Sequence, residues 1–372
     1  PVMPQPVIHG QEPYHNPVFS RLVPGSIKGT FSMEGQIVWG ASVIRHTDGK
    51  YYMFVSVWPD SEGSWVTSSQ VVLAVSDDPE GPYRFVKFVL PFRDRKYWDG
   101  GMSHNPVIRE HDGRYYLFYT GSTFGFEHPV GEKLDWFDPR YQEAWNNKRI
   151  GVATASHPTG PWKRLDRPVI EPRQGEWDFA ITSNAAPVIH DDGSVTLFYK
   201  SYYLKMGNPP EGISLPWEGP RVDTLPMSII GIARAREVTG AYDRVGPHRG
   251  MIEIEGQFVS LEDPTAWYDG EYYHMIVKNF GTEFIEEEMA AIYIRSKDGV
   301  HWDVPEDQPK AYSRTVTWRE GMTTTQRRLE RPQIFLENGR PSYLFLATGF
   351  AKESCADYRL PCCTYNVVMK IK

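Results

Sequence analysis

An internal repeat of about 70 residues constrains the fold of this chain more than any other feature of its sequence. Each unit reads as an apolar strand, an Asp-Gly or Asn-Gly dipeptide, and a second strand rich in aromatic residues. The dipeptide supplies the positive φ angles that a type I′ hairpin turn demands. Five such segments follow one another along the chain, at residues 41–55, 105–119, 186–199, 263–277 and 331–345.

A second hairpin follows the first in four of these units. It is clearest at 72–83 and 150–162, and weaker copies lie at 230–242 and 291–302. Two hairpins per unit make a four-stranded sheet, and such sheets repeated around an axis form a β-propeller. We therefore expect an all-β fold, a five-bladed β-propeller. The alternative is a β-sandwich built of hairpins, and the regular pairing of the two hairpin types argues against it.

The repeats also give the expected domain organisation. One propeller domain spans residues 1–372, and no linker marks a second domain. The fifth unit is short of a strand, so we expect an N-terminal segment to close the ring. The blades are expected at approximately 30–90, 98–170, 178–250, 258–310 and 326–372, with insertions on the blade faces at 124–147, 202–226 and 282–289.

Composition narrows the class of partner. The net charge is −7 and no run of Lys and Arg reaches five residues, so we expect no nucleic-acid partner. No apolar stretch is long enough for a membrane helix. The chain starts at Pro1 and not at a methionine, so we expect that any signal peptide has been removed from it. A secreted or periplasmic location is expected. The cysteines, Cys355, Cys362 and Cys363, form no disulfide framework and leave the redox compartment undecided.

Residues just before the innermost strand of each propeller blade converge on one central mouth. Here these positions are polar, acidic or aromatic. Carboxylates from different blades around one pocket suit cleavage of a glycosidic bond, because one acid protonates the leaving oxygen and a second carboxylate activates water or attacks the anomeric carbon. Tryptophan faces can stack on sugar rings, and amides and lysines can bind hydroxyls or an acidic group. The expected substrate-binding residues are Glu34, Trp39, Trp98, His104, Asn105, Trp177, Asn184, Lys200, Lys278, Glu330 and Arg331.

The repeated units, the Gly-Pro-Tyr and Gly-Pro-Trp turns at 81–83 and 160–162, and Glu-Asp-Pro at 262–264 resemble the five-bladed glycosidases of glycoside hydrolase family 43 and its family 117-like relatives. The resemblance spans essentially the whole chain. It implies glycosidase activity, with an acidic base at the start of blade 1, an aspartate that tunes pKa values, and a general-acid glutamate. Glu262 matches that glutamate.

The chain departs from the family pattern at the blade 1 aspartate, where it reads Trp39-Gly40-Ala41, and in blade 3, where it reads Asn184-Ala185-Ala186. A catalytic base must therefore come from elsewhere. Asp99 and Asp178 are the expected candidates because each follows a tryptophan before an inner strand, and Glu34 is a third.

Each of these residues also has a structural interpretation. Glu262 could tie down neighbouring backbone, and Asp263 before a proline is a usual turn former. The two Trp-Asp pairs could be a device for packing blades. Glu330 and Arg331 could form an internal ion pair, or Arg331 could hold a substrate carboxylate. The family resemblance implies a cation near the axis, such as calcium, for which His104 is the candidate ligand; no cofactor is otherwise expected.

The sequence thus predicts a glycoside hydrolase that acts on a plant or algal polysaccharide or oligosaccharide. One alternative is a lyase on uronate-bearing sugars, in which Arg331, Lys200 or Lys278 would neutralise the substrate carboxylate. Another is a propeller that binds carbohydrate without cleaving it, which the missing blade 1 carboxylate favours. The oligomeric state, the sugar and the linkage are left open by the sequence.

Overall fold

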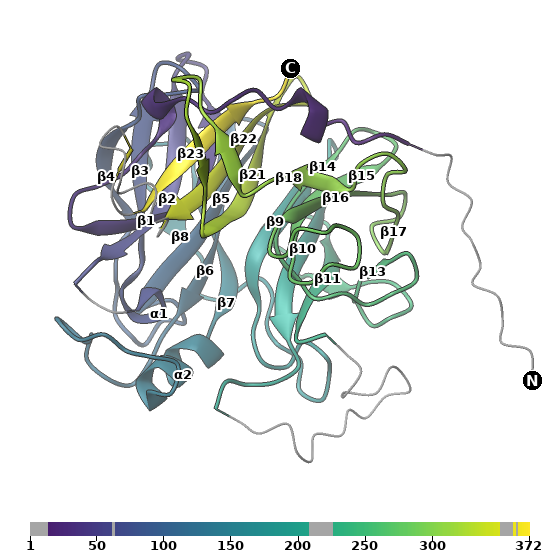
Figure 1. Ribbon diagram of the computed structural model, residues 1–372. Helices are drawn as coiled ribbons and strands as arrows, with labels where there is room; N and C mark the ends of the chain where they lie inside the picture. The colour runs from purple at the N-terminus through teal and green to yellow at the C-terminus, as the bar shows by residue number, and fades with distance from the viewer. Residues whose placement is uncertain (1–13, 62–63, 208–225, 350–359, 362–363) are drawn as a thin grey trace, which may run out of the picture.

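Five antiparallel sheets surround a central axis in this computed structural model (Figure 1). The structure describes residues 14–61, 64–207, 226–349, 360–361 and 364–372. The prediction of an all-β, five-bladed β-propeller is confirmed. All three cysteines, Cys355, Cys362 and Cys363, lie outside the described residues. No described helix is long and apolar enough to cross a membrane.

The blades follow one another in chain order, and the first strand of each blade lies nearest the axis. Blade 1 holds β1 (Gln36–Arg45), β2 (Tyr51–Pro59), β3 (Gln70–Ser76) and β4 (Arg84–Leu90). Blade 2 holds β5 (Met102–His111), β6 (Arg114–Ser122), β7 (Arg149–Ala155) and β8 (Lys163–Arg164). Blade 3 holds β9 (Ser183–Ile189), β10 (Val195–Tyr202), β11 (Ser228–Ala235) and β12 (Asp243–Arg244).

Blade 4 holds β14 (Leu261–Tyr268), β15 (Tyr273–Asn279), β16 (Ala291–Ser296) and β18 (Lys310–Tyr312). Blade 5 holds β21 (Arg328–Glu337), β22 (Arg340–Gly349) and β23 (Thr364–Lys370). Two small sheets pair β13 (Glu253–Ile254) with β17 (His301–Trp302), and β19 (Thr315–Thr317) with β20 (Thr323–Thr325). The helical turns are η1 (Phe19–Arg21), η2 (Ile27–Gly29), α1 (Trp65–Ser68) and α2 (Pro139–Asn146).

Neighbouring blades bury their faces against each other. Successive side chains of a strand point to opposite faces of its sheet, so one strand contributes side chains to the interfaces with both neighbouring blades. In β2, Met53 and Val55 pack against blade 5 with Phe345, whereas Phe54 packs against blade 2 with Leu117. The near-continuous apolar runs of the repeats follow from this burial on both faces.

An N-terminal segment completes blade 5. Residues 22–31 run along the outer edge of β23, where the amide of Val23 donates to the carbonyl of Lys370 at 2.8 Å. Phe31 and Asn366 exchange two backbone hydrogen bonds, at 3.2 and 3.0 Å. The start of the described chain therefore lies beside its last strand, and the ring of blades is closed by hydrogen bonds between the two.

Candidate active site at the mouth of the channel

Each inner strand contains a β-bulge, and one residue of the bulge has a positive φ angle. We call these five residues the axial ring: Gly40 (66°), Asn105 (50°), Asn184 (53°), Asp263 (56°) and Arg331 (54°). Gly, Asn and Asp adopt this backbone conformation readily, which explains four of the five. Arg331 does not, so its conformation depends on contacts made by the surrounding structure.

The polar side chains of the axial ring bind one another in sequence. Asn105 Nδ2 donates to Asn184 Oδ1 at 2.9 Å, and Asn184 Nδ2 donates to Asp263 Oδ1 at 2.7 Å. The backbone amide of Arg331 donates to Asp263 Oδ2 at 3.3 Å, and its guanidinium lies 3.4 Å from Oδ1. Asp263 is therefore more than the turn former that its place before a proline indicated.

Gly40 explains how the ring closes without a blade 1 carboxylate. A Cβ atom at this position would lie 3.2 Å from Asn105 Oδ1 and 3.3 Å from Arg331 Nε. The side chain of Arg331, from the adjacent blade 5, thus lies against the space that a blade 1 side chain would fill. Arg331 is almost fully buried, and its Nε and Nη2 atoms have no hydrogen-bond partner in the described part of the chain.

The mouth is the end of the channel at which the inner strands begin. The residues immediately before the axial ring are Trp39, His104, Ser183, Glu262 and Glu330. Glu262 and Glu330 come from adjacent blades, and both contact Lys278 Nζ, at 3.4 and 2.6 Å. Their two oxygens can be no farther apart than the sum of these distances. Lys200 forms a second ion pair with Glu262. The structure therefore brings together four residues expected from the sequence: Lys200, Glu262, Lys278 and Glu330.

These lysines set the charge of Glu262. Burial raises the pKa of its carboxyl, but the ammonium groups of Lys200 and Lys278 outweigh burial and lower the pKa to about 2. Glu262 is thus ionised in the free protein at neutral pH. The general-acid role that the family resemblance implied does not fit this charge state. Burial and the charge of Glu262 instead raise the pKa of Asp263 to about 6.

A third buried lysine in the mouth, Lys148, was not expected from the sequence. Its Nζ lies 4.0 Å from the ring centre of Trp145 and 4.9 Å from that of Trp65. It forms no ion pair or hydrogen bond through Nζ with any residue that the structure describes. Burial, and then the charge of Lys200, lower the pKa of Lys148 well below its usual value. Lys148 lies in no repeated segment, so no comparison between units could have found it.

Helices α1 and α2 supply the aromatic wall beside Lys148. Each follows the second strand of its blade, which runs back to the mouth, and the two helices lie together at one end of the molecule (Figure 1). Trp65 of α1 stacks on His104 with ring centres 4.6 Å apart, and Trp58 contacts the same ring edge-on at 5.6 Å. An apolar surface next to buried charges is the arrangement that carbohydrate sites share, because sugar rings have apolar faces and polar edges.

The surroundings of His104 do not fit a calcium ion. Ser69 Oγ lies 2.8 Å from His104 Nδ1, and burial followed by the charges of Arg331, Lys148 and Lys200 lowers the pKa of the imidazole well below its usual value. Calcium takes six to eight oxygen ligands, many of them carboxylates. Three cations face His104 instead, so we derive no catalytic step through a metal here.

The Trp-Asp pairs before β5 and β9 form closed ion-pair cages within the blades. Asp99 accepts hydrogen bonds from Arg93 (2.6 Å), Arg164 (3.2 Å) and Tyr119 (2.8 Å). Asp178 has the equivalent partners Arg173, Arg244 and Tyr199. The side chains of both aspartates have 0% exposed surface. They cannot reach a substrate, which corrects the expectation that one of them is the catalytic base.

The tryptophans of these pairs also pack inside the protein. Trp177 has 0% exposed surface and stacks on Tyr199, so it cannot bind a sugar ring. Trp98 is half-buried, stacks on Tyr119 and donates through Nε1 to the carbonyl of Leu165 at 3.2 Å. Glu34 is exposed in the turn before β1, and Trp39 is half-buried at the mouth. Of Trp98, Trp177, Glu34 and Trp39, only Trp39 lies next to the axial ring.

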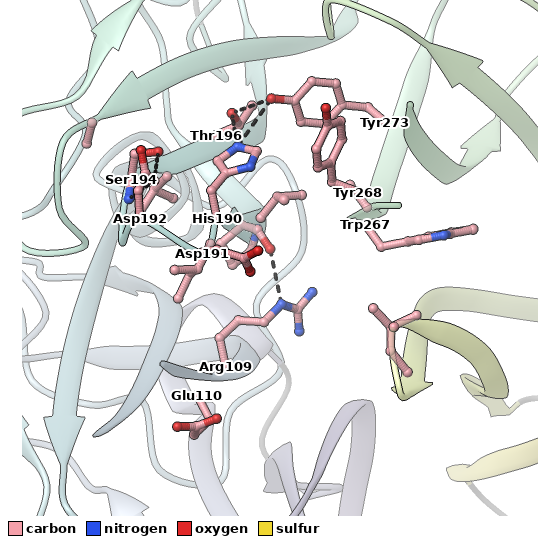
Figure 2. Close-up of a pocket in the computed structure, with 18 of the residues that line it drawn as sticks. Arg109, Glu110, His190, Asp191, Asp192, Ser194, Thr196, Trp267, Tyr268 and Tyr273 are labelled. Atoms are coloured by element: carbon pink, nitrogen blue, oxygen red, sulfur yellow. Dashed lines mark hydrogen bonds between the residues drawn. The ribbon is translucent and has the colours of Figure 1, made fainter. Parts of the chain in front are cut away.

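A hollow of about 1870 Å³ lies at the other end of the channel. Figure 2 shows its wall, with Arg109, His190, Trp267 and Tyr268 around the opening. None of the expected site residues lines it. Arg109 is held by the carbonyls of Ile108 (2.8 Å) and Pro187 (3.1 Å). The labelled acidic side chains of this wall, Glu110, Asp191 and Asp192, are exposed, so the buried carboxylate pair at the mouth is the better candidate for chemistry.

Solved structures of glycoside hydrolases share this five-bladed architecture. One described as a glycoside hydrolase matches with a TM-score of 0.61 and 13% identity, over 95% of this chain and 92% of that one. Zg3597, a family 117 glycoside hydrolase of the marine bacterium Zobellia galactanivorans, gives 0.58 and 18%, over 96% and 91%. CoXyl43, a family 43 β-xylosidase/α-arabinofuranosidase from a compost microbial metagenome, gives 0.55 and 15%, over 95% of both chains.

Comparison with protein-family models and with curated proteins gives no match. At the 13–18% identity of these three solved structures, the structural likeness establishes the fold. It confirms the resemblance to families 43 and 117 at the level of architecture.

Proposed function

We propose that this protein is a glycoside hydrolase whose catalytic pair is Glu262 and Glu330. The observation that carries the proposal is the contact of both carboxylates with one ammonium group, that of Lys278. It keeps two acidic groups from adjacent blades within reach of one glycosidic bond. Carboxyl groups of retaining glycosidases are about 5–5.5 Å apart and those of inverting enzymes about 6.5–9.5 Å. The two contacts with Lys278 keep the bridged oxygens within about 6 Å of each other, below the inverting range, which favours retention.

The two glutamates differ in the cations that hold them. Glu262 is paired with both Lys200 and Lys278, and it is the more strongly stabilised anion. We assign it the anionic role, attack on the anomeric carbon. Glu330 contacts Lys278 at 2.6 Å, and Arg328 is 4.0 Å away at the limit of an ion pair. We assign Glu330 the acid–base role: it first donates a proton to the leaving oxygen and then, as a base, takes a proton from the water that releases the sugar.

The charge of the mouth favours an acidic sugar as substrate. Four nearly fully buried cations lie there, Lys148, Lys200, Lys278 and Arg331, against three carboxylates, Glu262, Asp263 and Glu330. Lys148 is the cation without a carboxylate partner among the described residues. A uronate or sulfate group beside Lys148 would supply that partner, while Trp65 and Trp145 contact the apolar face of the sugar.

The decisive experiment is an activity screen on matched oligosaccharides, each acidic member paired with its neutral counterpart. We expect the wild-type protein to cleave an acidic member, and Glu262→Gln and Glu330→Gln each to lose about 10³-fold in kcat while their circular dichroism is unchanged. Azide should rescue Glu262→Ala with formation of a glycosyl azide, because azide can replace a missing carboxylate nucleophile. Unchanged turnover in Glu262→Gln would remove this residue from the mechanism.

Lys148 supports a second candidate, a lyase acting on uronate-bearing sugars. A buried amine with a lowered pKa can act as a base. It would take the proton next to the substrate carboxylate, the electron pair would form a carbon–carbon double bond, and the glycosidic oxygen would leave and gain a proton. Hydrolysis adds one water to the substrate and elimination adds none. Product masses and ultraviolet absorbance from the same screen therefore separate the two, and binding without product would indicate a non-catalytic propeller.

A further inference from the structure

A second cluster of titratable side chains lies outside the channel, on the small parallel sheet formed by β13 and β17 (Figure 1). Ligand atoms of His248, Glu253 and His301 all lie within 4.8 Å of one another, and all three residues are half-buried. Glu253 and His301 are the first residues of the two strands and pair directly in the sheet register. The cluster belongs neither to the mouth nor to the large hollow at the other end.

The contacts within this cluster have the spacing of metal ligands. His248 Nε2 lies 3.0 Å from Glu253 Oε2, and His301 Nε2 lies 3.5 Å from Glu253 Oε1. In a tetrahedral zinc site with bonds of about 2.0–2.1 Å, neighbouring ligand atoms are about 3.3 Å apart. Each imidazole therefore faces a different oxygen of one carboxylate at roughly the distance that a shared ion requires.

A fourth residue sets the orientation of His301. Asp298 Oδ2 lies 2.7 Å from His301 Nδ1, while Asp298 Oδ1 accepts hydrogen bonds from the amides of Val300 (2.8 Å) and His301 (2.9 Å). The carboxylate holds the Nδ1 hydrogen, so a neutral His301 turns the lone pair of Nε2 toward Glu253. Two acceptors that face each other need a proton or a cation between them. A carboxylate behind the other ring nitrogen is the usual support of a metal-binding histidine.

The backbone already holds the cluster in place. The amide of Glu253 donates to the carbonyl of Val300 at 2.9 Å, and the amide of Met251 donates to that of His248 at 3.1 Å. The ring of His248 packs edge-on against Phe258, with ring centres 5.3 Å apart. Binding an ion would therefore need only small side-chain movements, which keeps the entropic cost of forming the site low.

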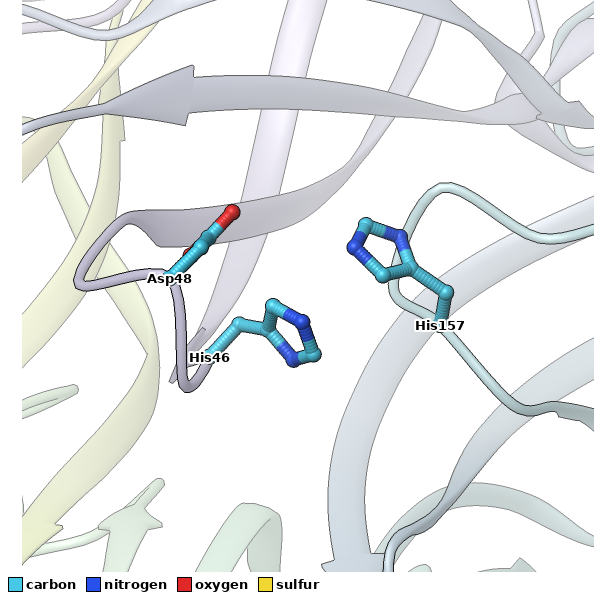
Figure 3. A group of neighbouring side chains, drawn as sticks. All are labelled: His46, Asp48 and His157. Carbon is cyan, nitrogen blue, oxygen red and sulfur yellow. The ribbon is translucent and has the colours of Figure 1, made fainter.

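A second group, His46, Asp48 and His157, makes an informative contrast (Figure 3). Asp48 is exposed, and its two oxygens already accept hydrogen bonds from the amide of Lys50 (2.9 Å) and the hydroxyl of Tyr52 (2.7 Å). Within the described residues it forms no ion pair with either imidazole. This group serves as the internal control.

We propose that His248, Glu253 and His301 bind one divalent transition-metal ion, with Asp298 as the positioning residue behind His301. Two imidazole nitrogens and one carboxylate suit zinc best, and they leave a fourth position for water. Because the three ligands come from the segment after blade 3 and from the segment after β16, the ion would tie these two segments together. The site is independent of the glycosidase proposal.

The test is a metal titration of the full chain after treatment with a chelator. We expect one equivalent of Zn²⁺ in calorimetry, a rise in Tm on binding, and a Co²⁺ absorption spectrum typical of low coordination number. His248→Ala and Glu253→Gln should abolish stoichiometric binding, and Asp298→Asn should weaken it about 10- to 100-fold. His46→Ala is the matched control and should bind normally.

Absence of stoichiometric binding to the wild-type protein, or binding lost in His46→Ala and kept in His248→Ala, would overturn the proposal. X-ray absorption on the zinc-loaded wild-type protein tests the same claim without any substitution. Two imidazole nitrogens in the first coordination sphere are expected, and a sphere without imidazole would contradict it.

Discussion

The protein buries acidic groups among cations in two places, the Asp99 and Asp178 cages within the blades and the Glu262–Glu330 pair at the mouth. In the cages the cations are arginines, a tyrosine hydroxyl adds a further donor, and the aspartate side chains have 0% exposure. At the mouth the cations paired with Glu262 are Lys200 and Lys278, and the side chain of Glu262 keeps 19% of its surface exposed. Both sites hold buried negative charge, yet only one is open to a ligand.

The choice of cation separates a structural site from a candidate catalytic one. Arginine stays charged in proteins and donates in a fixed planar geometry, so it suits a permanent, fully satisfied ion pair. Lysine is a point charge on a flexible stem, and its pKa moves with its surroundings. Buried charge alone therefore does not mark catalysis. The remaining exposure of the carboxylate and the kind of cation beside it are the informative features.

Breaking a cage should produce the largest effect. We expect Asp99→Asn to lower the free energy of unfolding by about 3–5 kcal/mol, because it removes the fully buried counter-ion that Arg93 and Arg164 share. Asp166 pairs with the same Arg93 at 3.0 Å but its side chain is 72% exposed. Asp166→Asn should therefore cost less than about 1 kcal/mol. Urea denaturation measures the free energy of unfolding of both variants. Equal losses would show that the buried ion pairs of Asp99 stabilise the fold no more than the exposed pair of Asp166.

Removing the bridge at the mouth should change chemistry more than stability. Lys278→Met takes away one of the two cations that lower the pKa of Glu262, so that pKa should rise and the acid limb of the pH–rate profile should move up by about one pH unit. Lys310→Met is the control, because Lys310 pairs with Glu287 in the insertion between β15 and β16 and not with Glu262 or Glu330. If the acid limb does not move in Lys278→Met, the ionisation of Glu262 does not set that limb.

The pH dependence of stability should distinguish Asp263 from Glu262. The folded-state pKa of Asp263 is raised from 3.8 to about 6, so stability should rise as the pH falls from 7 towards 4.5. The pKa of Glu262 is lowered from 4.5 to about 2, so its contribution should be lost as the pH falls from 4.5 towards 2. The effect of each is about 1–3 kcal/mol.

Denaturation of the wild type and Asp263→Asn across about pH 2–8, a range that includes both folded-state pKa values, checks this expectation. The variant should lose the rise between pH 7 and 4.5 and keep the loss at lower pH. If both proteins show the same profile, Asp263 is not the group that takes up the proton.

Exchanging the cations should have the smallest effect on stability and tests the comparison directly. Arg164→Lys keeps the charge beside Asp99 but loses the paired donors, and we expect a cost of about 1 kcal/mol with turnover unchanged. Lys200→Arg should leave stability within about 0.5 kcal/mol and reduce turnover, because it fixes the anion of Glu262 in a rigid pair. The reverse pattern would mean that arginine and lysine are interchangeable here.

The fold could be predicted because its signals are local. An Asp-Gly turn between two apolar runs defines a hairpin within fifteen residues, and its repetition sets the number of blades. The short fifth unit likewise indicated that blade 5 lacks a strand of its own. Each of these signals needs only neighbouring residues.

The site was only partly accessible from the sequence. Glu262 and Glu330 could be found because each lies next to an axial-ring residue that precedes a proline, a repeated landmark. Asp99 precedes β5 by three residues and is turned into the blade, where Arg164 of β8 reaches it. Lys148 lies at the end of the blade 2 insertion, just after α2 and outside the repeated segments. Both outcomes are set by tertiary contacts between segments far apart in the chain.

Closure of blade 5 by residues 22–31 has a consequence for biogenesis. The edge strand β23 is made more than three hundred residues after the segment that pairs with it, so during synthesis the earlier blades must wait as an open arc with an unpaired edge. Maturation should therefore end in one slow, all-or-none joining step. Until that step, the nascent arc would be the species most in need of chaperone protection.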